Sequence, residues 1–417
     1  GYAFTDDEQE ADIIVINTCC FINDAKEESI NTILEMAEYR ESGNCKALIV
    51  TGCLAQRYQE EIEKEIPQVD AILGTNSYDA IAEAVKNVLG GSHYENFKTL
   101  EGLPAVSAKR SLTTGGHYAH LKIAEGCNKH CTYCIIPKIR GEYRSIPIEE
   151  LVESARELAA QGVKELILVA QETTLYGIDL YGEKSLYRLL DELNKIEGIY
   201  WIRILYCYPE EIDDKLIASI KRNEKVCHYL DLPIQHADDM ILKRMGRRTS
   251  QADLRSIVTK LRSDIPDIAL RTTLICGFPG ETEKEHESLM YFINEMEFDR
   301  LGAFTYSPEE DTPAPAPEEN RYPTVATDLT DGETVNASYR TFYVQAFDYQ
   351  GSILSSSSVE VSGNGQKIYS VSTDGEGIIA YRMELTETEN TVNIKVTDSE
   401  GWTTTLPTYK IYKGEEE

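Results

Sequence analysis

Short apolar segments alternate with helix-like segments from residue 13 to residue 306, and this alternation constrains the fold more than any other feature of the chain. Strands that are apolar along their length and separated by helices form parallel sheets covered on both faces. The pattern therefore predicts an α/β protein over this part of the sequence. It stops at Pro313-Ala314-Pro315-Ala316-Pro317, and we expect residues 313–321 to form a stiff, extended linker.

Residues 1–92 contain three β–α units. Their expected strands are 13–16, 47–50 and 71–74, and their expected helices are 24–40, 54–65 and 78–89. Three units predict a small, partial N-terminal domain with a parallel sheet. Residues 93–116 are expected to be a linker.

Six further units fill residues 117–312. The expected strands are 118–124, 164–170, 200–206, 228–234, 268–275 and 299–306, with helices at 148–161, 185–196, 210–221, 250–264 and 281–296. Six such units favour an open, partial (β/α)6 barrel over a flat sheet. In barrels of this kind the chemistry lies on the loops that follow the strands.

Residues 322–417 change in character. They are rich in Ser, Thr, Val and Tyr, show the alternation of a half-buried strand at 392–396, and carry turn signals at Asp331-Gly332 and Asp374-Gly375. This pattern predicts an antiparallel β-sandwich. The segment contains no cluster of metal-ligating or nucleophilic residues.

The chain carries 41 basic and 71 acidic side chains, a net charge of −30. This charge argues against a nucleic-acid surface spread over a whole domain, so any RNA contact would be local. The basic segment 243–248 could meet RNA or a partner protein, or could simply be solvated. No apolar run reaches the roughly 18–20 residues of a membrane span, and no signal peptide is visible.

All ten cysteines lie between Cys19 and Cys276, which is typical of metal ligation in a reducing compartment rather than of a disulfide scaffold. We therefore expect a cytoplasmic protein. Cys127, Cys131 and Cys134 follow the first barrel strand. Three thiolates can hold three irons of a cubane cluster and leave the fourth iron open to a small chelating molecule. A structural zinc site with His130 as the fourth ligand is the alternative.

This Cys-x3-Cys-x2-Cys loop, with Tyr133 before its last cysteine, resembles the radical S-adenosylmethionine superfamily. The resemblance implies that the open iron of a [4Fe–4S] cluster binds S-adenosylmethionine. An electron from the cluster then cleaves this cofactor to methionine and a 5′-deoxyadenosyl radical. Tyr133 would lie near the adenine.

Two other segments extend the resemblance. Gly277, Gly280 and Glu281 lie in residues 275–282, which are similar to the superfamily's glycine-bearing loop and would let the backbone approach the cofactor. A Gly/Pro turn that opens a helix is also common. Gln171 and Glu172 end the second barrel strand, where the superfamily contacts the methionine amino group; a solvated strand end is the alternative.

Residues 1–312 resemble the methylthiotransferases within this superfamily. Cys19 and Cys53 both follow parallel strands, so their thiols could meet at one edge of the sheet. They match two of three cysteines that hold a second [4Fe–4S] cluster in the family. The third would precede Gly1, so we expect this site to lack one ligand, and Cys20 to point elsewhere. Buried cysteines that only pack are the alternative.

Segments 20–29, 118–123, 169–177 and 208–211 are most similar to the RimO type. That resemblance implies transfer of a methylthio group to the β-carbon of an aspartate in a small-subunit ribosomal protein, the S-twelve protein. It also implies contact with that protein or the ribosome, and an electron donor such as flavodoxin or ferredoxin. A transfer-RNA-modifying enzyme of the MiaB type is a second hypothesis.

The resemblance ends near Thr312, where the family has a small TRAM barrel. The sandwich at 322–417 instead resembles immunoglobulin-like modules of bacterial surface proteins. A third hypothesis is therefore an inactive fragment fused to an adhesion-type binding module.

Overall fold

The computed structural model describes residues 2–103, 112, 115–314, 323–348, 352–374, 377–399 and 403–414. The chain forms two compact units, Gly1–Ala316 and Pro317–Glu417. The boundary between them falls inside the segment predicted as a linker, 313–321.

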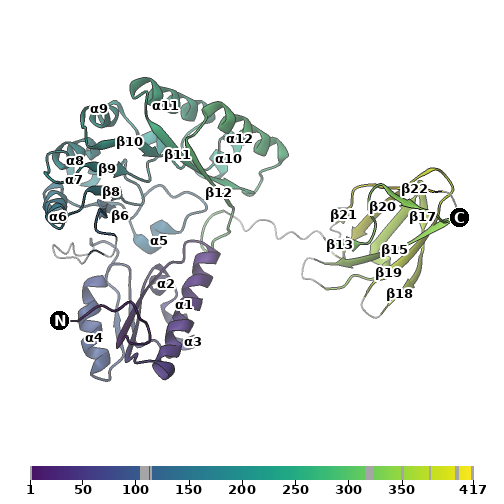
Figure 1. Ribbon diagram of the computed structural model, residues 1–417, viewed down its shortest axis with the longest axis horizontal. Coiled ribbons are helices and arrows are strands. Elements are labelled where there is room, and N and C mark those ends of the chain that lie inside the picture. Colours follow the sequence, from purple (N-terminus) through teal and green to yellow (C-terminus); the bar gives the residue numbers. More distant parts are fainter. Residues whose placement is uncertain are drawn as a thin grey trace. The chain divides into compact units, whose positions relative to one another are not determined.

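The N-terminal part of the first unit is a parallel sheet of four strands in the order β1-β2-β3-β4. Figure 1 shows α4 on one face of this sheet and α1 and α3 on the other. The strands are β1 (Ile13–Thr18), β2 (Ala47–Gly52), β3 (Ala71–Leu73) and β4 (Tyr94–Asn96), and the helices are α1 (Asn23–Ser42), α2 (Cys53–Arg57), α3 (Gln59–Glu65), η1 (Tyr78–Ala80) and α4 (Ile81–Leu89).

Two features of this sheet differ from expectation. The segment predicted as a linker, 93–116, begins with the fourth strand, β4. Its three residues, Tyr94-Glu95-Asn96, are too few and too polar to show a strand pattern, and only pairing with β3 makes them a strand. The helix expected at 54–65 is two helices that meet at Tyr58, because the chain leaves helical geometry there.

The second part of the first unit is the barrel. Its six parallel strands have the order β12-β11-β10-β9-β8-β5, so within the described residues β5 and β12 are unpaired edges and the barrel is open. The strands are β5 (Tyr118–Lys122), β8 (Glu165–Val169), β9 (Trp201–Ile204), β10 (Val226–Asp231), β11 (Ala269–Cys276) and β12 (Arg300–Thr305). Two short antiparallel strands flank the cysteine loop, residues 127–134: β6 (Ala124–Glu125) precedes it and β7 (Arg144–Ser145) follows it.

Helices surround this sheet (Figure 1). They are α5 (Ile136–Arg140), α6 (Ile148–Ala160), α7 (Ile178–Tyr181), α8 (Leu186–Leu193), η2 (Pro209–Glu211), α9 (Asp214–Arg222), α10 (Asp239–Arg244), α11 (Gln251–Asp264) and α12 (Glu283–Met296). Capping side chains explain where three of these helices begin. Asp213 accepts the Leu216 amide at the start of α9, and Ser250 and Thr282 form capping boxes with acidic residues three positions later at the starts of α11 and α12.

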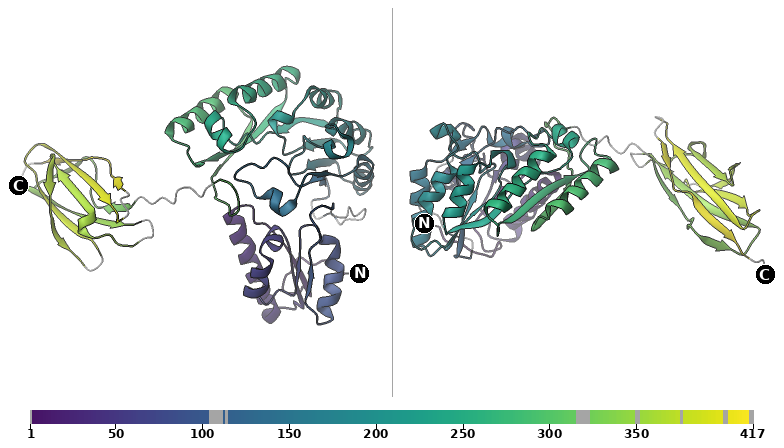
Figure 2. Two further views of the ribbon diagram at one scale, coloured as in Figure 1. Left: turned by 180° about the vertical axis from the view of Figure 1, so that it is seen from behind. Right: turned by 90° about the horizontal axis from the view of Figure 1, so that it is seen from above.

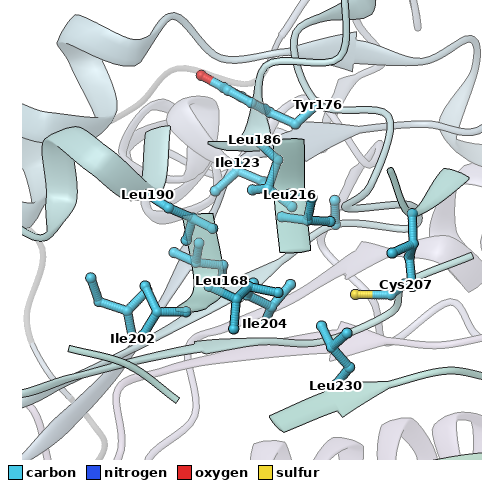
Figure 3. Packing of buried hydrophobic residues seen from close by; sticks show 14 of the residues in the cluster. Ile123, Leu168, Tyr176, Leu186, Leu190, Ile202, Ile204, Cys207, Leu216 and Leu230 are labelled. Carbon is cyan, nitrogen blue, oxygen red and sulfur yellow. The ribbon is translucent and has the colours of Figure 1, made fainter. Parts of the chain in front are cut away.

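The main core lies between the barrel strands and the outer helices. Figure 3 shows Leu168, Ile202 and Ile204 of the strands packed with Leu190 of α8 and Leu216 of α9. Because side chains alternate along a strand, the residues between these face the barrel interior, and several of them are charged. Arg203 pairs with Glu165 at 2.6 Å and Arg271 with Asp231 at 2.6 Å. The barrel interior is therefore polar.

The N-terminal sheet and the barrel meet around a buried carboxylate. Glu309, which follows β12, lies 2.7 Å from Nζ of Lys26 on α1 and 2.5 Å from Nη1 of Arg57 on α2. Its side chain is 1% exposed. Helix α5 also lies between the two parts, as Figures 1 and 2 both show. These contacts join the two predicted domains into one unit.

The second unit, residues 317–417, is a pair of sheets. Strand order is β13-β15-β19-β18 in one sheet and β14-β22-β20-β16-β17 in the other, where β21 also pairs with β20. The strands are β13 (Thr324–Thr327), β14 (Glu333–Val335), β15 (Tyr339–Phe347), β16 (Val359–Gly363), β17 (Gln366–Ile368), β18 (Ser370–Thr373), β19 (Ile379–Glu384), β20 (Glu389–Thr397), β21 (Thr403–Thr405) and β22 (Tyr409–Lys413). The pairing is antiparallel, as expected, except that β14 runs parallel to β22. Likeness to immunoglobulin modules stays a prediction.

Among the described residues, no helix combines the length and the apolar character needed to cross a bilayer.

Glu309→Gln is expected to lower the free energy of unfolding by about 3–5 kcal/mol, because it leaves Lys26 and Arg57 largely buried without a compensating charge. Urea denaturation of the full chain measures this loss. Glu310→Gln is the matched control, since that neighbouring carboxylate is 73% exposed and should contribute less than about 1 kcal/mol. Equal losses in the two variants would contradict the role given to Glu309.

Candidate functional site

The cysteine loop is held from two sides. Thr132 donates its amide to the Met245 carbonyl at 3.0 Å and its hydroxyl to the Arg244 carbonyl at 2.8 Å. On the other side, Asn128 Oδ1 accepts the Tyr143 amide at 2.9 Å. These contacts fix both halves of a loop that has no regular secondary structure of its own.

Its three thiols lie close enough to influence one another. Cys127 and Cys131 are buried and Cys134 is half-buried. Burial raises the pKa of Cys127 to about 11 and that of Cys134 to about 12, and the neighbouring thiols add to both shifts. A coordinated thiol is deprotonated by its metal, so a metal group removes this penalty. The donor set therefore fits the iron–sulfur cluster implied by its sequence.

The zinc alternative fits less well. A tetrahedral site needs its ligand atoms close around one ion. Among the described residues, the only three His, Cys or carboxylate ligand atoms that lie within 4.8 Å of one another belong to the exposed Glu63, His93 and Glu95, not to this loop. The side chain of His130 is exposed. A cubane does not require such close ligands, because each thiolate binds a different iron.

Three residues in or beside the loop make contacts that the sequence patterns did not predict. Lys129 is buried and pairs with Glu211, with Glu210 at 3.4 Å. Tyr208 places its hydroxyl 3.4 Å from Cys131 Sγ, and the Arg247 guanidinium stacks 4.2 Å above the Tyr208 ring. The loop is therefore surrounded by buried charges and aromatic rings brought from β9 and α10, which only the fold places there.

The glycine loop, residues 275–282, lies beside the cysteine loop. Tyr133 packs edge-on against Phe278 with ring centroids 6.2 Å apart. Gly277 and Gly280 have φ values of +73° and +88°. L side chains rarely adopt such φ values, so this backbone conformation favours glycine at both positions.

Glu281 uses both of its oxygens inside the protein. Oε2 accepts the amides of Gly277 at 2.6 Å and Phe278 at 3.0 Å. Oε1 lies 3.0 Å from His286 Nδ1 and 3.5 Å from His236 Nε2. Although burial opposes ionisation, the hydrogen bonds from the two histidines and from Phe278 outweigh it and lower the pKa of Glu281 to about 2. We therefore expect Glu281 to shape the glycine loop.

Gln171 and Glu172 follow β8, and neither is a solvated strand end. Gln171 Oε1 accepts the Gly126 amide at 2.8 Å, which ties β8 to the start of the cysteine loop. Glu172 is fully buried, and burial raises its pKa to about 7 although Thr174 donates two hydrogen bonds to Oε1. Its Oε2 has no hydrogen-bond partner among the described residues. A ligand group that donates a hydrogen bond would satisfy this oxygen.

Cys19 and Cys53 come together at the edge of the N-terminal sheet, as their positions after β1 and β2 predict. Burial raises the pKa of Cys53, Arg140 opposes this rise, and Cys19 adds to it. Arg140 Nη2 lies 3.1 Å from Cys53 Sγ. Cys20 does not simply point elsewhere: it is fully buried, and Cys53 and Cys19 both contribute to raising its pKa to about 12, after burial itself. The donor chemistry fits iron at this edge, with three thiols in electrostatic range.

The basic segment 243–248 is only partly available to a partner. Lys243, Arg244 and Arg248 are exposed, whereas Arg247 is buried and donates to the Pro233 carbonyl at 3.0 Å. Arg247 therefore belongs to the barrel interior.

Comparison with known proteins places this geometry in a class. Residues 121–293 match the Radical SAM superfamily, and residues 1–74 match the Uncharacterized protein family UPF0004. A solved radical S-adenosylmethionine methyltransferase, TsrM from Kitasatospora setae, has a similar fold: its TM-score is 0.54 at 15% identity, over 78% of this chain and 71% of that one. Residues 121–293 thus match the radical S-adenosylmethionine class, and the fold agrees with that match.

Closer relatives define the family. The protein named ribosomal protein uS12 methylthiotransferase RimO from Lachnoclostridium phytofermentans is 67% identical over 314 residues, which is 75% of this chain and 71% of the relative. The protein of that name from Acetivibrio thermocellus is 54% identical over 320 residues, 75% of this chain and 70% of the relative. The chain belongs to the RimO family. It is a radical S-adenosylmethionine methylthiotransferase that uses [4Fe–4S] clusters and S-adenosylmethionine.

The predicted fold class, cofactors and enzyme family are therefore confirmed. The domain boundaries and the individual site residues stay predictions. Neither sequence family extends into the second unit.

Glu281→Gln is expected to destabilise the chain in a pH-dependent way. Because the folded-state pKa of Glu281 lies below the ordinary value of 4.5, its carboxylate stabilises the fold fully above about pH 4.5, and this contribution is lost as the pH falls toward 2. The stability difference between wild type and Glu281→Gln should be larger at about pH 7 than at about pH 3. Urea unfolding at both values measures it. Glu287→Gln, which changes an exposed carboxylate on the following helix, α12, should show no such trend.

Proposed function

We propose that this chain transfers a methylthio group to the β-carbon of an aspartate in ribosomal protein uS12. The observation that carries this proposal is the cysteine loop: three interacting thiols next to a glycine loop at the carboxyl ends of the barrel strands, in a chain 67% identical to a protein named for this activity. Cys127, Cys131 and Cys134 would hold one [4Fe–4S] cluster. When bound, the cluster would supply the electron, and S-adenosylmethionine would supply the methyl group and the radical that abstracts hydrogen; the sulfur would come from the second iron–sulfur group, at Cys19 and Cys53.

The protein's own residues hold and orient the cofactor. The Tyr133 ring packs against Phe278 and would contact the adenine of the cofactor. Glu281 keeps the Gly277 and Phe278 amides in place, so the backbone of the glycine loop can approach the cofactor closely. Gln171 ties the loop start to β8. The buried rings and ion pairs around Cys131 exclude water from one side of the loop.

Glu172 is the residue best suited to the amino group of S-adenosylmethionine. Its Oε2 is buried and without a partner among the described residues, so a cationic ligand would supply the hydrogen bond and the charge that this oxygen lacks. A nearby cation also favours the ionised form of a carboxyl whose pKa burial has raised to about 7.

The second metal group would use Cys19 and Cys53. Cys20 is the nearest further thiol, since Cys53 and Cys19 both influence its pKa. Arg140 would compensate part of the negative charge of the ligating sulfurs.

The partners follow from the same chemistry. We infer a low-potential electron donor such as flavodoxin or ferredoxin, uS12 free or on the ribosome as substrate, and a reducing compartment such as the cytoplasm. Any local contact with RNA would be made by the exposed residues of the basic segment, Lys243, Arg244 and Arg248. The hypothesis of a MiaB-type enzyme has no separate observation in its favour.

Replacement of Cys127, Cys131 and Cys134 by Ala is expected to remove about four irons per chain after anaerobic reconstitution, and to abolish methylthio transfer to uS12. Iron and acid-labile sulfide assays, with mass spectrometry of uS12, measure the two losses. The control variant changes Cys45, Cys207 and Cys227 to Ala and should keep its iron. Wild-type chain without iron would favour the hypothesis of an inactive fragment.

Glu172→Gln is expected to weaken binding of S-adenosylmethionine about 10- to 100-fold, because a charge-assisted hydrogen bond contributes roughly 1.5–3 kcal/mol. Equilibrium dialysis with the reconstituted chain gives the dissociation constant. Glu150→Gln on the outer face of α6 is the control. Unchanged affinity in Glu172→Gln would show that the amino group binds elsewhere.

A further inference from the structure

Arg140 touches two parts of the molecule at once. It is the last residue of α5, the short helix that follows the cysteine loop. Its Nη2 donates to Cys53 Sγ at 3.1 Å, and its Nη1 donates to the Tyr78 hydroxyl at 3.1 Å. The same Nη1 lies 3.5 Å from Oε1 of Glu125 on β6, the strand that leads into the cysteine loop. One guanidinium thus connects the N-terminal sheet to both ends of that loop.

The surroundings of Arg140 keep it in place. Glu125 is fully buried and also pairs with Lys122, so its carboxylate is a fixed anchor. Ile139, the residue before Arg140, packs in the core of the N-terminal sheet, and its carbonyl accepts the Thr75 hydroxyl at 3.2 Å. In Figures 1 and 2 this helix lies between the N-terminal sheet and the barrel. The position of Arg140 is therefore set by packing on both sides.

The contact with Cys53 has an electrostatic consequence. Cys53 is buried, which disfavours a negative sulfur, and among its neighbours the Arg140 guanidinium opposes this effect most strongly. Arginine stays charged at every accessible pH, and its N–H groups donate in a fixed plane. Hydrogen bonds to ligating sulfurs stabilise the more negative, reduced state of an iron–sulfur group and so raise its reduction potential.

We propose that Arg140 is a positioning residue for the second metal site: it holds the Cys53 sulfur next to the cysteine loop and raises the reduction potential of the iron–sulfur group bound there. This inference rests on the proposed function, because it needs that group to be present at Cys19 and Cys53. It gives a direct link between the two metal sites that does not involve the substrate.

The first test is a redox titration of the full chain with Cys127, Cys131 and Cys134 replaced by Ala, so that only the second site binds iron. Arg140→Gln should lower the midpoint potential by at least the equivalent of a tenfold change in the reduction equilibrium, about 59 mV for one electron. Arg140→Lys, which keeps the charge without the planar fork, should recover part of this shift. Lys138→Gln, the same charge change at an exposed position on α5, should leave the potential unchanged. Equal potentials in Arg140→Gln and Lys138→Gln would overturn the proposal.

A second test uses the iron-free chain, so it also applies if the second metal site binds no iron. A second site without iron would by itself count against the proposed function and not against the role of Arg140. In the iron-free chain, the urea midpoint is compared for Arg140→Gln, Cys53→Ser and the double variant. If Arg140 positions Cys53, the double variant loses less stability than the two single variants together. Additive losses would overturn the inference. The pair Lys138→Gln and Cys53→Ser should be additive.

Discussion

The carboxyl ends of parallel strands lie at one edge of a sheet, and this constraint assembles the whole site. In the N-terminal sheet it brings together Cys19 and Cys53, which are 34 positions apart in the sequence. In the barrel it brings the cysteine loop, the end of β8 and the glycine loop to one side. The contact between Arg140 and Cys53 then joins the two edges. Thiols that are distant in sequence therefore meet without any disulfide.

Buried charges determine how these edges fit together. Glu309 lies between Lys26 and Arg57, and Glu125 lies between Lys122 and Arg140. An unpaired charge would be costly in such places, so each carboxylate restricts the positions of its two cations. Glu309 thereby joins the segment after β12 to α1 and α2, and Glu125 joins β6 to α5.

Much of the architecture could be predicted because it depends on local patterns. All six barrel strands and the cysteine loop follow from apolar periodicity and from cysteine spacing. The strand β4 could not be predicted, because three polar residues form a strand only through pairing with β3. Arg140 and Tyr208 could not be assigned roles either, since their contacts with Cys53 and Cys131 join segments 87 and 77 positions apart. Long-range electrostatics leaves no mark on sequence periodicity.

Two carboxylates next to the cysteine loop differ in whether the protein itself supplies all of their partners. Glu281 meets two backbone amides and two histidines, and its pKa falls to about 2. Within the described part of the chain, the Glu172 carboxylate accepts hydrogen bonds only from Thr174, through Oε1, and burial raises its pKa to about 7. The first carboxylate has all its partners within the protein, so it fixes the glycine loop. The second has a buried oxygen that the described residues leave unpaired, which is why we propose it as the partner of a cationic cofactor group.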